Sequence, residues 1–345
     1  MLRIAVIADI MERIPPQYYG GVERVVYLLI KYLVKRGHKV TLFASDDSLV
    51  PCRLIPFGHR SGKSAAGNAR NLFTLYAQLI KLRKEFDIIQ CFGRTLYLLP
   101  LLPLPLIKIQ SYGCPTNPKK IRRAHRLARG TLTFVACSHS CARERLDVGR
   151  WEIIYHGVEF EEYKYNPNPE GKYLAFLGRL CRIKGVHTAI DIAKAAHQQL
   201  KIAGTIASCG PDLEYFKNEI EPRIDGNQIQ YIGSVDDKQK SEFLGQAGAL
   251  LFPIEWEEPF GLVIIEAMAC GTPVIALKRG AVPEIVSDGI NGFICNSKSE
   301  MISAIGNIYR ISRQQCRKTV ETRFCAEKAA LEYERLYARL LGAVR

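Results

Sequence analysis

Short apolar runs separated by helix-forming stretches recur along this chain in two consecutive series. The first series opens with the apolar run from Leu2 to Ala8, a helical stretch from Val22 to Lys35 and a second apolar run from Lys39 to Ala44. An order of strand, helix and strand makes a unit whose two strands pair in parallel. We therefore predict an α/β chain built on parallel sheets.

The second series begins after the polar stretch from Glu161 to Gly171, which contains Pro167 and Pro169 and has the composition of a linker. At 345 residues the chain also exceeds what a single hydrophobic core usually supports. Two series and two cores predict two Rossmann-like domains, over residues 1–165 and 166–325, followed by a helical tail over 326–345. Ligands in such sheets lie beyond the carboxyl ends of the strands.

The segment from Glu258 to Ala276 has the order loop, short helix, glycine stop and strand. The helix is expected over Leu262–Ala269, with Glu258 just ahead of it and Glu266 about one turn inside it. The first turn of a helix presents backbone N–H groups and the positive end of its dipole, which together favour an anion such as a phosphate. A diphosphate between two carboxylates predicts a nucleotide sugar, because carboxylates accept hydrogen bonds from ribose and sugar hydroxyls.

This segment carries the pattern E-x7-E followed by A-M-A-x-G-x-P-V-I-A, and it resembles the signature of family 4 of the retaining, nucleotide-sugar-dependent glycosyltransferases. Gly178-Arg179 with Lys184-Gly185 is similar to a second element of that family, G-R-x-x-x-x-K-G, and the run from Gly21 to Arg24 is similar to its opening pattern. The resemblance implies the GT-B architecture: two Rossmann-like domains facing across a cleft, with a C-terminal helix crossing back to the first domain.

The resemblance also implies roles for individual residues. Glu258 is expected to hold the sugar, and Arg179 and Lys184 to stabilise the departing diphosphate, so these three are the predicted catalytic residues. The predicted donor-binding residues are Gly21, Gly178, Val235, Phe260, Gly261, Leu262 and Glu266. No D-x-D motif is present, so we expect no metal site, no obligatory divalent cation and no other cofactor.

The predicted activity is that of a retaining, metal-independent hexosyltransferase. It would move a hexosyl group from a nucleotide diphosphate sugar to a hydroxyl of a glycan, a glycolipid or a small molecule. A nucleotide-sugar epimerase on the same fold stays open as an alternative, as does a basic binding protein without catalysis. A phosphorylase is disfavoured because it would need a pyridoxal phosphate lysine and a much longer chain.

The net charge of +14 is concentrated in the first half of the chain. Residues 1–165 hold 26 Lys and Arg against 13 Asp and Glu, whereas residues 166–345 hold 22 against 21. A helix over Lys119–Arg129 would gather Arg122, Arg123, Arg126 and Arg129 on one cationic face, with Ile121, Ala124, Leu127 and Ala128 opposite. This face is predicted to contact the acceptor or an anionic membrane surface, or to be merely solvated. Nucleic acid is not an expected partner, since no recognisable nucleic-acid fold is present.

Two positions depart from the family pattern. The loop where the family usually has a histidine contains Tyr112, which either replaces it or belongs to the core, and His156-Gly157 stands where Asn-Gly is usual.

The chain has no 18-residue apolar run, no signal-peptide pattern and no C-x-x-C spacing among its eleven cysteines. We therefore expect a cytoplasmic protein that is either fully dissolved or peripheral at a membrane.

Overall fold

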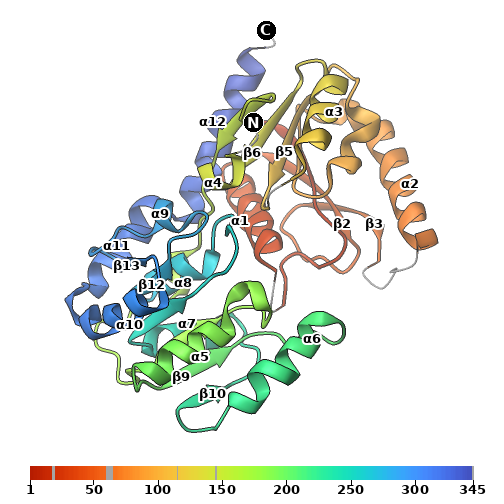
Figure 1. The fold of residues 1–345 in the computed structure, drawn as a ribbon. Coiled ribbons are helices and arrows are strands. Elements are labelled where there is room, and N and C mark those ends of the chain that lie inside the picture. The colour runs from red at the N-terminus through yellow and green to blue at the C-terminus, as the bar shows by residue number, and fades with distance from the viewer. Residues whose placement is uncertain (18–19, 60–64, 115, 144–145, 344–345) are drawn as a thin grey trace. The chain divides into compact units, whose positions relative to one another are not determined.

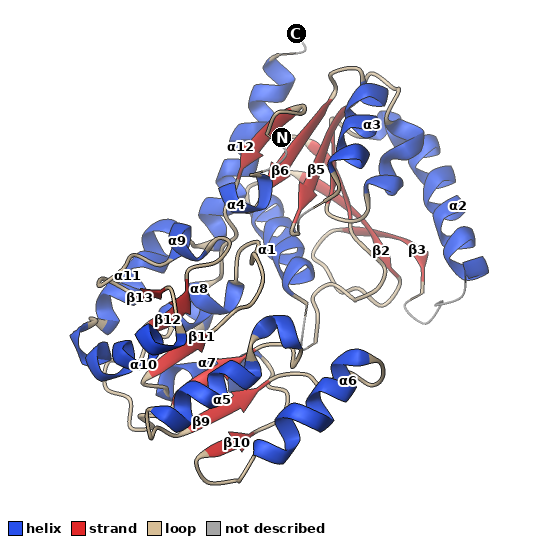
Figure 2. Cartoon of the chain, viewed as in Figure 1, coloured by secondary structure: helices blue, strands red, loops and turns tan. Residues whose placement is uncertain are grey.

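The computed structural model describes residues 1–17, 20–59, 65–114, 116–143 and 146–343. The chain forms two compact units, one of Met1–His156 with Ala326–Arg345 and the other of Gly157–Cys325. Each unit contains one parallel sheet with helices packed against it, drawn in Figures 1 and 2. The prediction of an α/β chain with two Rossmann-like domains is confirmed.

The first unit has a seven-stranded parallel sheet with the strand order β3-β2-β1-β4-β5-β6-β7. Its strands are β1 Arg3–Ile7, β2 Lys39–Ser45, β3 Arg53–Gly58, β4 Ile88–Cys91, β5 Ile107–Tyr112, β6 Leu132–Ala136 and β7 Arg150–Ile153. Its α-helices are α1 Gly21–Lys35, α2 Ala65–Leu82, α3 Pro118–Ala128, α4 His139–Ala142 and α12 Ala326–Gly342.

Successive residues of β1 enter two different cores, because side chains alternate across a strand. Ile4 and Val6 pack in a cluster with residues of α1 and α12, whereas Ala5 and Ile7 pack in a second cluster with residues of α2 and α3. The sheet is therefore buried on both faces, which explains why the sequence shows unbroken apolar runs instead of an alternating pattern.

Helix α12 returns to the first unit, as predicted, and packs against α1. Tyr337 is fully buried there, and the Tyr333 hydroxyl lies 3.1 Å from Ser111 Oγ. Glu334 Oε2 accepts a hydrogen bond of 2.6 Å from Arg36 Nε. The last helix of the chain thus completes the core of the unit that contains its first strand.

The second unit has a six-stranded parallel sheet with the strand order β10-β9-β8-β11-β12-β13. Its strands are β8 Leu174–Leu177, β9 Leu200–Ala203, β10 Ile229–Tyr231, β11 Ala249–Phe252, β12 Val274–Leu277 and β13 Gly292–Cys295. Its α-helices are α5 Val186–Ala195, α6 Pro211–Tyr215, α7 Asp237–Gln246, α8 Leu262–Ala269, α9 Val282–Ile285, α10 Lys298–Asn307 and α11 Arg313–Arg323.

Two strands were not expected from the sequence. β3 lies at the edge of its sheet, is mostly half-exposed and contains Pro56, so it lacks a continuous apolar run. β13 is an edge strand of four residues that begins at Gly292. Short edge strands have weak sequence signals because one side is not buried by a neighbouring strand.

The second unit begins at Gly157, nine residues before the predicted domain boundary at 165/166. The stretch between the two positions contacts the second unit closely. Val158 N donates to Phe324 O at 2.9 Å, and Lys164 N donates to Ser241 Oγ at 2.8 Å. Backbone hydrogen bonds therefore attach this polar stretch to the unit that follows it.

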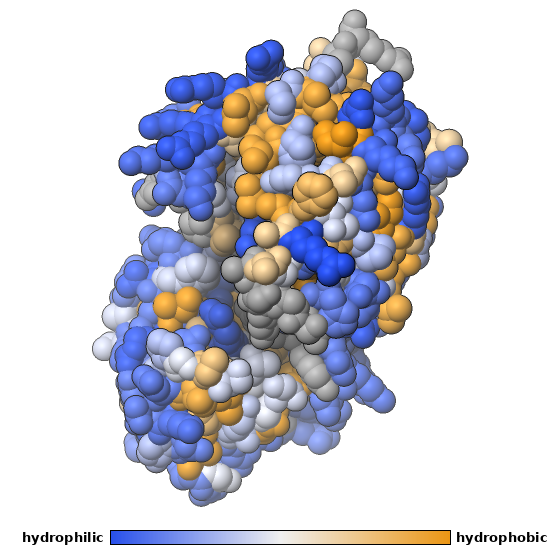
Figure 3. Space-filling model, turned by 90° about the vertical axis from the view of Figure 1, so that its right-hand side faces the viewer, coloured by the Kyte–Doolittle hydropathy of each residue, from blue (hydrophilic) through white to orange (hydrophobic). Residues whose placement is uncertain are grey.

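The first unit exposes apolar side chains along the outer side of α2. Phe73 and Ile80 of α2 are exposed, as are Leu96 and Leu99 of the 3-10 helix Thr95–Leu101, which packs against α2. Figure 3 shows apolar and polar residues interspersed over the first unit. In the described part of the chain, no helix has the length and apolarity needed to cross a membrane.

Candidate functional site

The predicted catalytic residues lie at the carboxyl ends of strands of the second unit. Gly178 and Arg179 follow β8, and the loop that carries Glu258 follows β11. β8 and β11 are neighbours at the point where the strand order reverses. In doubly wound sheets this switch point is where ligands bind.

Helix α8 begins beside this switch point, at the residues predicted from the sequence. Its N-cap Gly261 has φ 87°, a left-handed conformation that glycine adopts without strain. The first turn of α8 contains no acidic side chain, and no side chain caps it. The N-terminus of α8 therefore keeps the positive electrostatic character that favours an anion.

Glu258 is buried in contact with two donors. Its Oε2 lies 2.6 Å from Lys184 Nζ and accepts a hydrogen bond of 2.7 Å from Trp256 Nε1. The side chains of Lys184 and Glu258 are 16% and 9% exposed, so water screens this ion pair little. The structure thus brings together two of the three residues that the sequence predicted to be catalytic.

Glu266 forms a second buried ion pair from inside α8. Its Oε1 lies 2.6 Å from Lys240 Nζ on α7 and accepts a hydrogen bond of 2.9 Å from the Tyr163 hydroxyl. Lys240 Nζ also lies 3.1 Å from Asp237 Oδ1. Two glutamates, each neutralised by a lysine, therefore lie before and within α8.

Two glycines allow the backbone to pack closely around Glu258. A Cβ on Gly280, whose φ is 56°, would lie 2.2 Å from the carbonyl oxygen of Glu258. A Cβ on Gly185, whose φ is 74°, would lie 2.0 Å from the carbonyl oxygen of Pro253. Ala281 N also donates to Glu258 O at 2.8 Å. Residues larger than glycine at positions 185 and 280 would therefore clash with the backbone of the loop that carries Glu258.

The other predicted residues of this unit follow the carboxyl ends of three strands, β8, β10 and β11. Gly178 has open space where a Cβ would be, and Arg179 is half-buried. Val235 is half-buried in the loop before α7, whose capping box is formed by Asp236 and Gln239. Phe260 and Gly261 are buried, and Leu262 is the half-buried first residue of α8.

The remaining predicted residues belong to the first unit. Gly21 is the first residue of α1 and follows Gly20, whose φ is 155°. Arg122, Arg123, Arg126 and Arg129 are all exposed on or directly after α3. The apolar face of α3 is narrower than predicted, because Leu127 is 48% exposed while Ile121, Ala124 and Ala128 are buried. The expectation that Leu127 belongs to the buried apolar face was wrong, because its side chain is exposed.

Tyr112 belongs to the core of the first unit. Its ring stacks on Phe134 with centroids 6.1 Å apart, and its hydroxyl lies 2.8 Å from Thr95 Oγ1. His156, the other departure from the family pattern, is half-buried, and desolvation lowers its pKa to about 4. Of the two alternatives for Tyr112, the structure therefore supports a place in the core.

Three side chains that contact the glutamates were missed from the sequence: Lys240, Tyr163 and Trp256. Trp256 lies two residues before Glu258, so its proximity in the chain was an available signal. Lys240 and Tyr163 are 26 and 103 residues away from Glu266. Nothing local in the sequence marks a pairing over such separations.

Comparison with known proteins gives two family matches. The family described as Glycosyl transferases group 1 matches residues 158–321, and Glycosyltransferase Family 4 matches residues 19–162. An uncharacterized glycosyltransferase of Methanocaldococcus jannaschii is 30% identical over 241 residues, which are 65% of this chain and 64% of that protein. The chain therefore spans less than two thirds of the length of this relative.

Solved structures share the fold over nearly the whole chain. Sucrose-phosphate synthase from Thermosynechococcus elongatus aligns with a TM-score of 0.83 at 20% identity, over 99% of this chain and 100% of the other. Anabaena HepE in complex with UDP-glucose aligns with a TM-score of 0.75 at 17% identity, over 99% and 100%. At these identities the similarity shows a common two-domain fold.

Proposed function

We propose that the chain, whose two halves match the group 1 and family 4 glycosyltransferase families, transfers a hexosyl group from a nucleotide diphosphate sugar to an acceptor hydroxyl. In this proposal the transfer retains the anomeric configuration and needs no metal ion. The observation that carries the proposal is the pair of buried glutamates, each held by a lysine, on either side of the start of α8.

The donor diphosphate would lie at the N-terminus of α8, near the backbone of Phe260, Gly261 and Leu262. Lys184 can serve it without releasing Glu258, because an ammonium has three N–H donors and Glu258 takes one. Arg179, which follows β8, would supply the second positive charge. These groups stabilise the charge that develops on the diphosphate as it leaves.

The two glutamates would divide the hydroxyl groups of the donor between them. Glu266 Oε1 accepts from Lys240 and Tyr163, and a carboxylate has a second oxygen that can accept from the ribose. Glu258 is held by Lys184 and Trp256 and would accept from the sugar beside the bond that breaks. Anabaena HepE, which shares the fold, was solved with UDP-glucose; this supports a nucleotide sugar as the ligand class here.

The transfer step needs no protein nucleophile. The bond between the anomeric carbon and the diphosphate oxygen breaks, and the acceptor oxygen bonds to that carbon from the same face. The acceptor hydroxyl gives its proton to an oxygen of the departing diphosphate, so charge and atoms balance. Most of the catalysis then comes from positioning the reactants and from electrostatic stabilisation.

The acceptor side of the proposal concerns the first unit. The exposed arginines of α3 would bind an anionic acceptor or the surface of an anionic membrane that holds a lipid-linked acceptor. In either case the protein would work in the cytoplasm, fully dissolved or peripheral at the membrane.

A panel of uridine, guanosine and adenosine diphosphate sugars tests the proposal. At least one donor should raise the melting temperature of the protein, because a ligand present at 100 times its dissociation constant adds about 2.7 kcal/mol of stability. The same donor should release its nucleoside diphosphate when acceptor sugars are added, with EDTA present throughout. A protein that binds none of the panel contradicts the proposal, and full loss of turnover in EDTA, restored by magnesium or manganese, contradicts metal independence.

A further inference from the structure

The loop that follows β11 carries Glu255 in addition to Glu258 and Trp256. Only three positions separate Glu255 from Glu258. Glu255 N donates to Ile183 O at 2.9 Å, and its Oε1 accepts a hydrogen bond of 2.9 Å from Thr188 Oγ1 on α5. The loop is therefore attached through Glu255 to α5 and to the 3-10 helix Arg182–Lys184, which carries Lys184.

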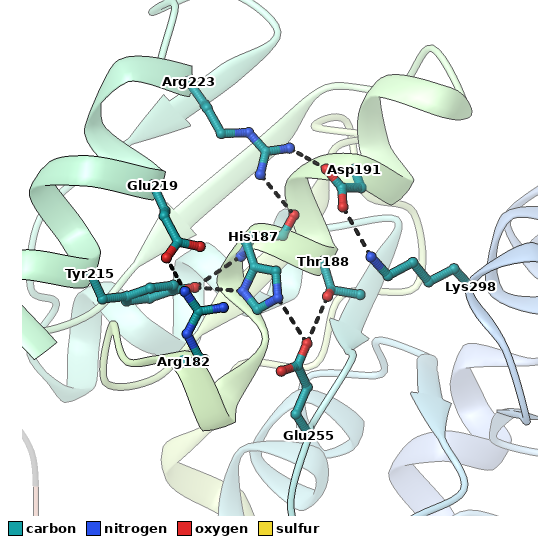
Figure 4. Close-up of polar contacts among 9 residues, drawn as sticks. All are labelled: Arg182, His187, Thr188, Asp191, Tyr215, Glu219, Arg223, Glu255 and Lys298. Carbon is teal, nitrogen blue, oxygen red and sulfur yellow. Dashed lines mark hydrogen bonds and ion pairs between the residues drawn. The ribbon is translucent and has the colours of Figure 1, made fainter. Parts of the chain in front are cut away.

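His187 on α5 is the second group on Glu255 Oε1. Its Nε2 lies 2.9 Å from that oxygen, and its Nδ1 lies 2.8 Å from the Tyr215 hydroxyl on α6 (Figure 4). The backbone N–H of His187 also donates to the Tyr215 hydroxyl at 3.2 Å. The imidazole thus connects the last residue of α6 with the loop that carries Glu258.

The contacts specify one tautomer of the neutral ring. Glu255 as a carboxylate only accepts, so Nε2 carries the proton and donates it. Nδ1 then accepts from the Tyr215 hydroxyl, whose oxygen in turn accepts from the His187 backbone. Each donor in this series of hydrogen bonds from Tyr215 to Glu255 has an acceptor. The hydrogen bonds on both ring nitrogens therefore fix the orientation of the imidazole.

Further charged residues surround this chain of hydrogen bonds. The Arg182 guanidinium lies over the Tyr215 ring, 5.0 Å from its centroid, and pairs with Glu219. Arg223 Nη1 donates to His187 O at 3.3 Å and pairs with Asp191, which also lies 3.0 Å from Lys298 Nζ. Figure 4 shows these groups around His187, with Glu255 on one side of the ring and Tyr215 on the other.

We propose that His187 is a positioning residue: through Glu255 it fixes the loop that places Trp256 and Glu258 against the donor sugar. The proposal rests on the proposed function for its catalytic consequence. Glu258 depends on its loop because Trp256 from the same loop donates to it at 2.7 Å. A displacement of about 1 Å at a reacting group can cost about 100-fold in rate, so a loop that loses its attachment should lose turnover.

The surroundings of His187 favour its neutral form. Burial lowers the pKa of His187, and the positive charges of Arg182 and Lys298 lower it further. The negative charges of Glu255 and Asp191 raise the pKa but offset only part of this effect. The ring therefore stays neutral at pH 7. This agrees with the tautomer given above, in which Nε2 donates to Glu255 and Nδ1 accepts from Tyr215.

Trp256 fluorescence tests the attachment without any substrate. The chain has two tryptophans, so a Trp151→Phe background leaves Trp256 as the only reporter. In that background His187→Ala should increase acrylamide quenching of Trp256. His187→Gln should stay near the parent, because its amide nitrogen reaches the place of Nε2, and His187→Asn should behave like alanine, because it reaches only the place of Nδ1. His197→Asn, at an exposed histidine just after α5, is the matched control.

Steady-state kinetics with the active donor test the catalytic consequence. His187→Ala and His187→Asn should lower kcat by about 10- to 100-fold with little change in the donor KM, since Glu258 acts on the reacting sugar. His187→Gln should restore most of the rate, which a general loss of folding would not allow. The proposal fails if His187→Ala leaves quenching and kcat unchanged, or if glutamine and alanine variants behave alike. Absence of turnover in the wild-type protein contradicts the proposed function, whereas the quenching series still decides the role of His187.

Discussion

The two units share the order of their first strands but differ in the charges at the switch point. In the second unit, two lysine–glutamate pairs are buried between α7, α8 and the loops after β8 and β11. In the first unit, the loops after β1 and β4 carry Asp9 and Arg94, whose ion pair of 3.2 Å is partly exposed, with the Arg94 side chain 59% exposed. One topology therefore supports a site of buried, fixed charges in one unit and a solvated charge pair in the other.

The strand order therefore determines where a ligand can bind, whereas the side chains at that position determine which ligand binds and what reaction follows. A buried charge pair holds its groups in one geometry, and removal of one partner leaves an uncompensated charge. An exposed pair is screened by water and contributes about 0 to 1 kcal/mol. In the proposed function the fixed pairs belong to the donor site, so their variants should be the more damaging ones.

The largest effect is expected at the pair of Lys184 and Glu258. Lys184→Ala, and likewise Arg179→Ala, should reduce transition-state stabilisation by about 3 kcal/mol, as loss of a preorganised donor to a developing negative charge does. Glu258→Ala should slow transfer while leaving nucleotide binding nearly intact. Steady-state kinetics and nucleoside diphosphate titration measure both quantities.

Arg94→Ala in the first unit is the matched comparison for stability. Its free energy of unfolding should fall by about 1 kcal/mol or less, because the Asp9–Arg94 pair is exposed. Denaturant unfolding of Lys184→Ala and Arg94→Ala measures the two losses side by side. Equal losses of stability would contradict the claim that the buried pair contributes more than the exposed pair.

The second effect concerns donor affinity at Glu266. Glu266→Ala should weaken binding of the nucleotide sugar by about 2 kcal/mol, a typical contribution of hydrogen bonds to a charged group. Lys240→Ala should weaken it too, because Glu266 then loses the cation 2.6 Å away that neutralises it. Calorimetric titration gives the affinities; wild-type binding by both variants would remove Glu266 from the donor site.

The sequence predicts this region better than any other because the determinants of α8 are local. Its bounds, Leu262–Ala269, agree with the prediction because a left-handed glycine precedes it and Gly271 follows it closely. The partners of its glutamates are distant in the chain, and they come from tertiary packing that no spacing reveals. The edge strand β3 was missed for the related reason that half-exposed residues carry no clear pattern.

A third prediction compares buried lysines in the two units. Lys108 in β5 is fully buried, and its Nζ donates to the carbonyl oxygens of Leu104 and Leu106 at 2.7 and 2.9 Å. Burial lowers the pKa of Lys108 to about 8 from 10.5. Above pH 8 the unfolded chain binds this proton more readily than the folded chain does, so stability should rise with pH up to about 10.5, by at most about 1.4 kcal/mol per pH unit.

Denaturant unfolding of wild-type protein and Lys108→Met between pH 7 and 10.5 measures this contribution as a difference of slopes. The wild-type stability should rise more steeply with pH than that of the variant. Parallel curves would contradict a lowered pKa of Lys108.

The last comparison concerns the exposed arginines on and directly after α3. If Arg122, Arg123, Arg126 and Arg129 contact an anionic membrane, each should contribute about 1 kcal/mol, and the attraction should fade as the Debye length falls from about 10 Å at 0.1 M salt to about 3 Å at 1 M. Sedimentation with anionic vesicles should show binding at low salt that the four-fold glutamine variant loses, while its donor affinity stays unchanged. No binding to anionic vesicles at low salt would leave a soluble acceptor as the proposal.

Titration of the protein with nucleotide diphosphate sugars in EDTA tests the central claim most directly, because that claim places a metal-free donor site at the start of α8. Wild-type protein should bind one donor of the panel, Glu266→Ala should bind it more weakly, and Glu258→Ala should bind its nucleoside diphosphate as the wild type does. Equal affinities in all three proteins, or binding that appears only when magnesium or manganese is added, would contradict the account.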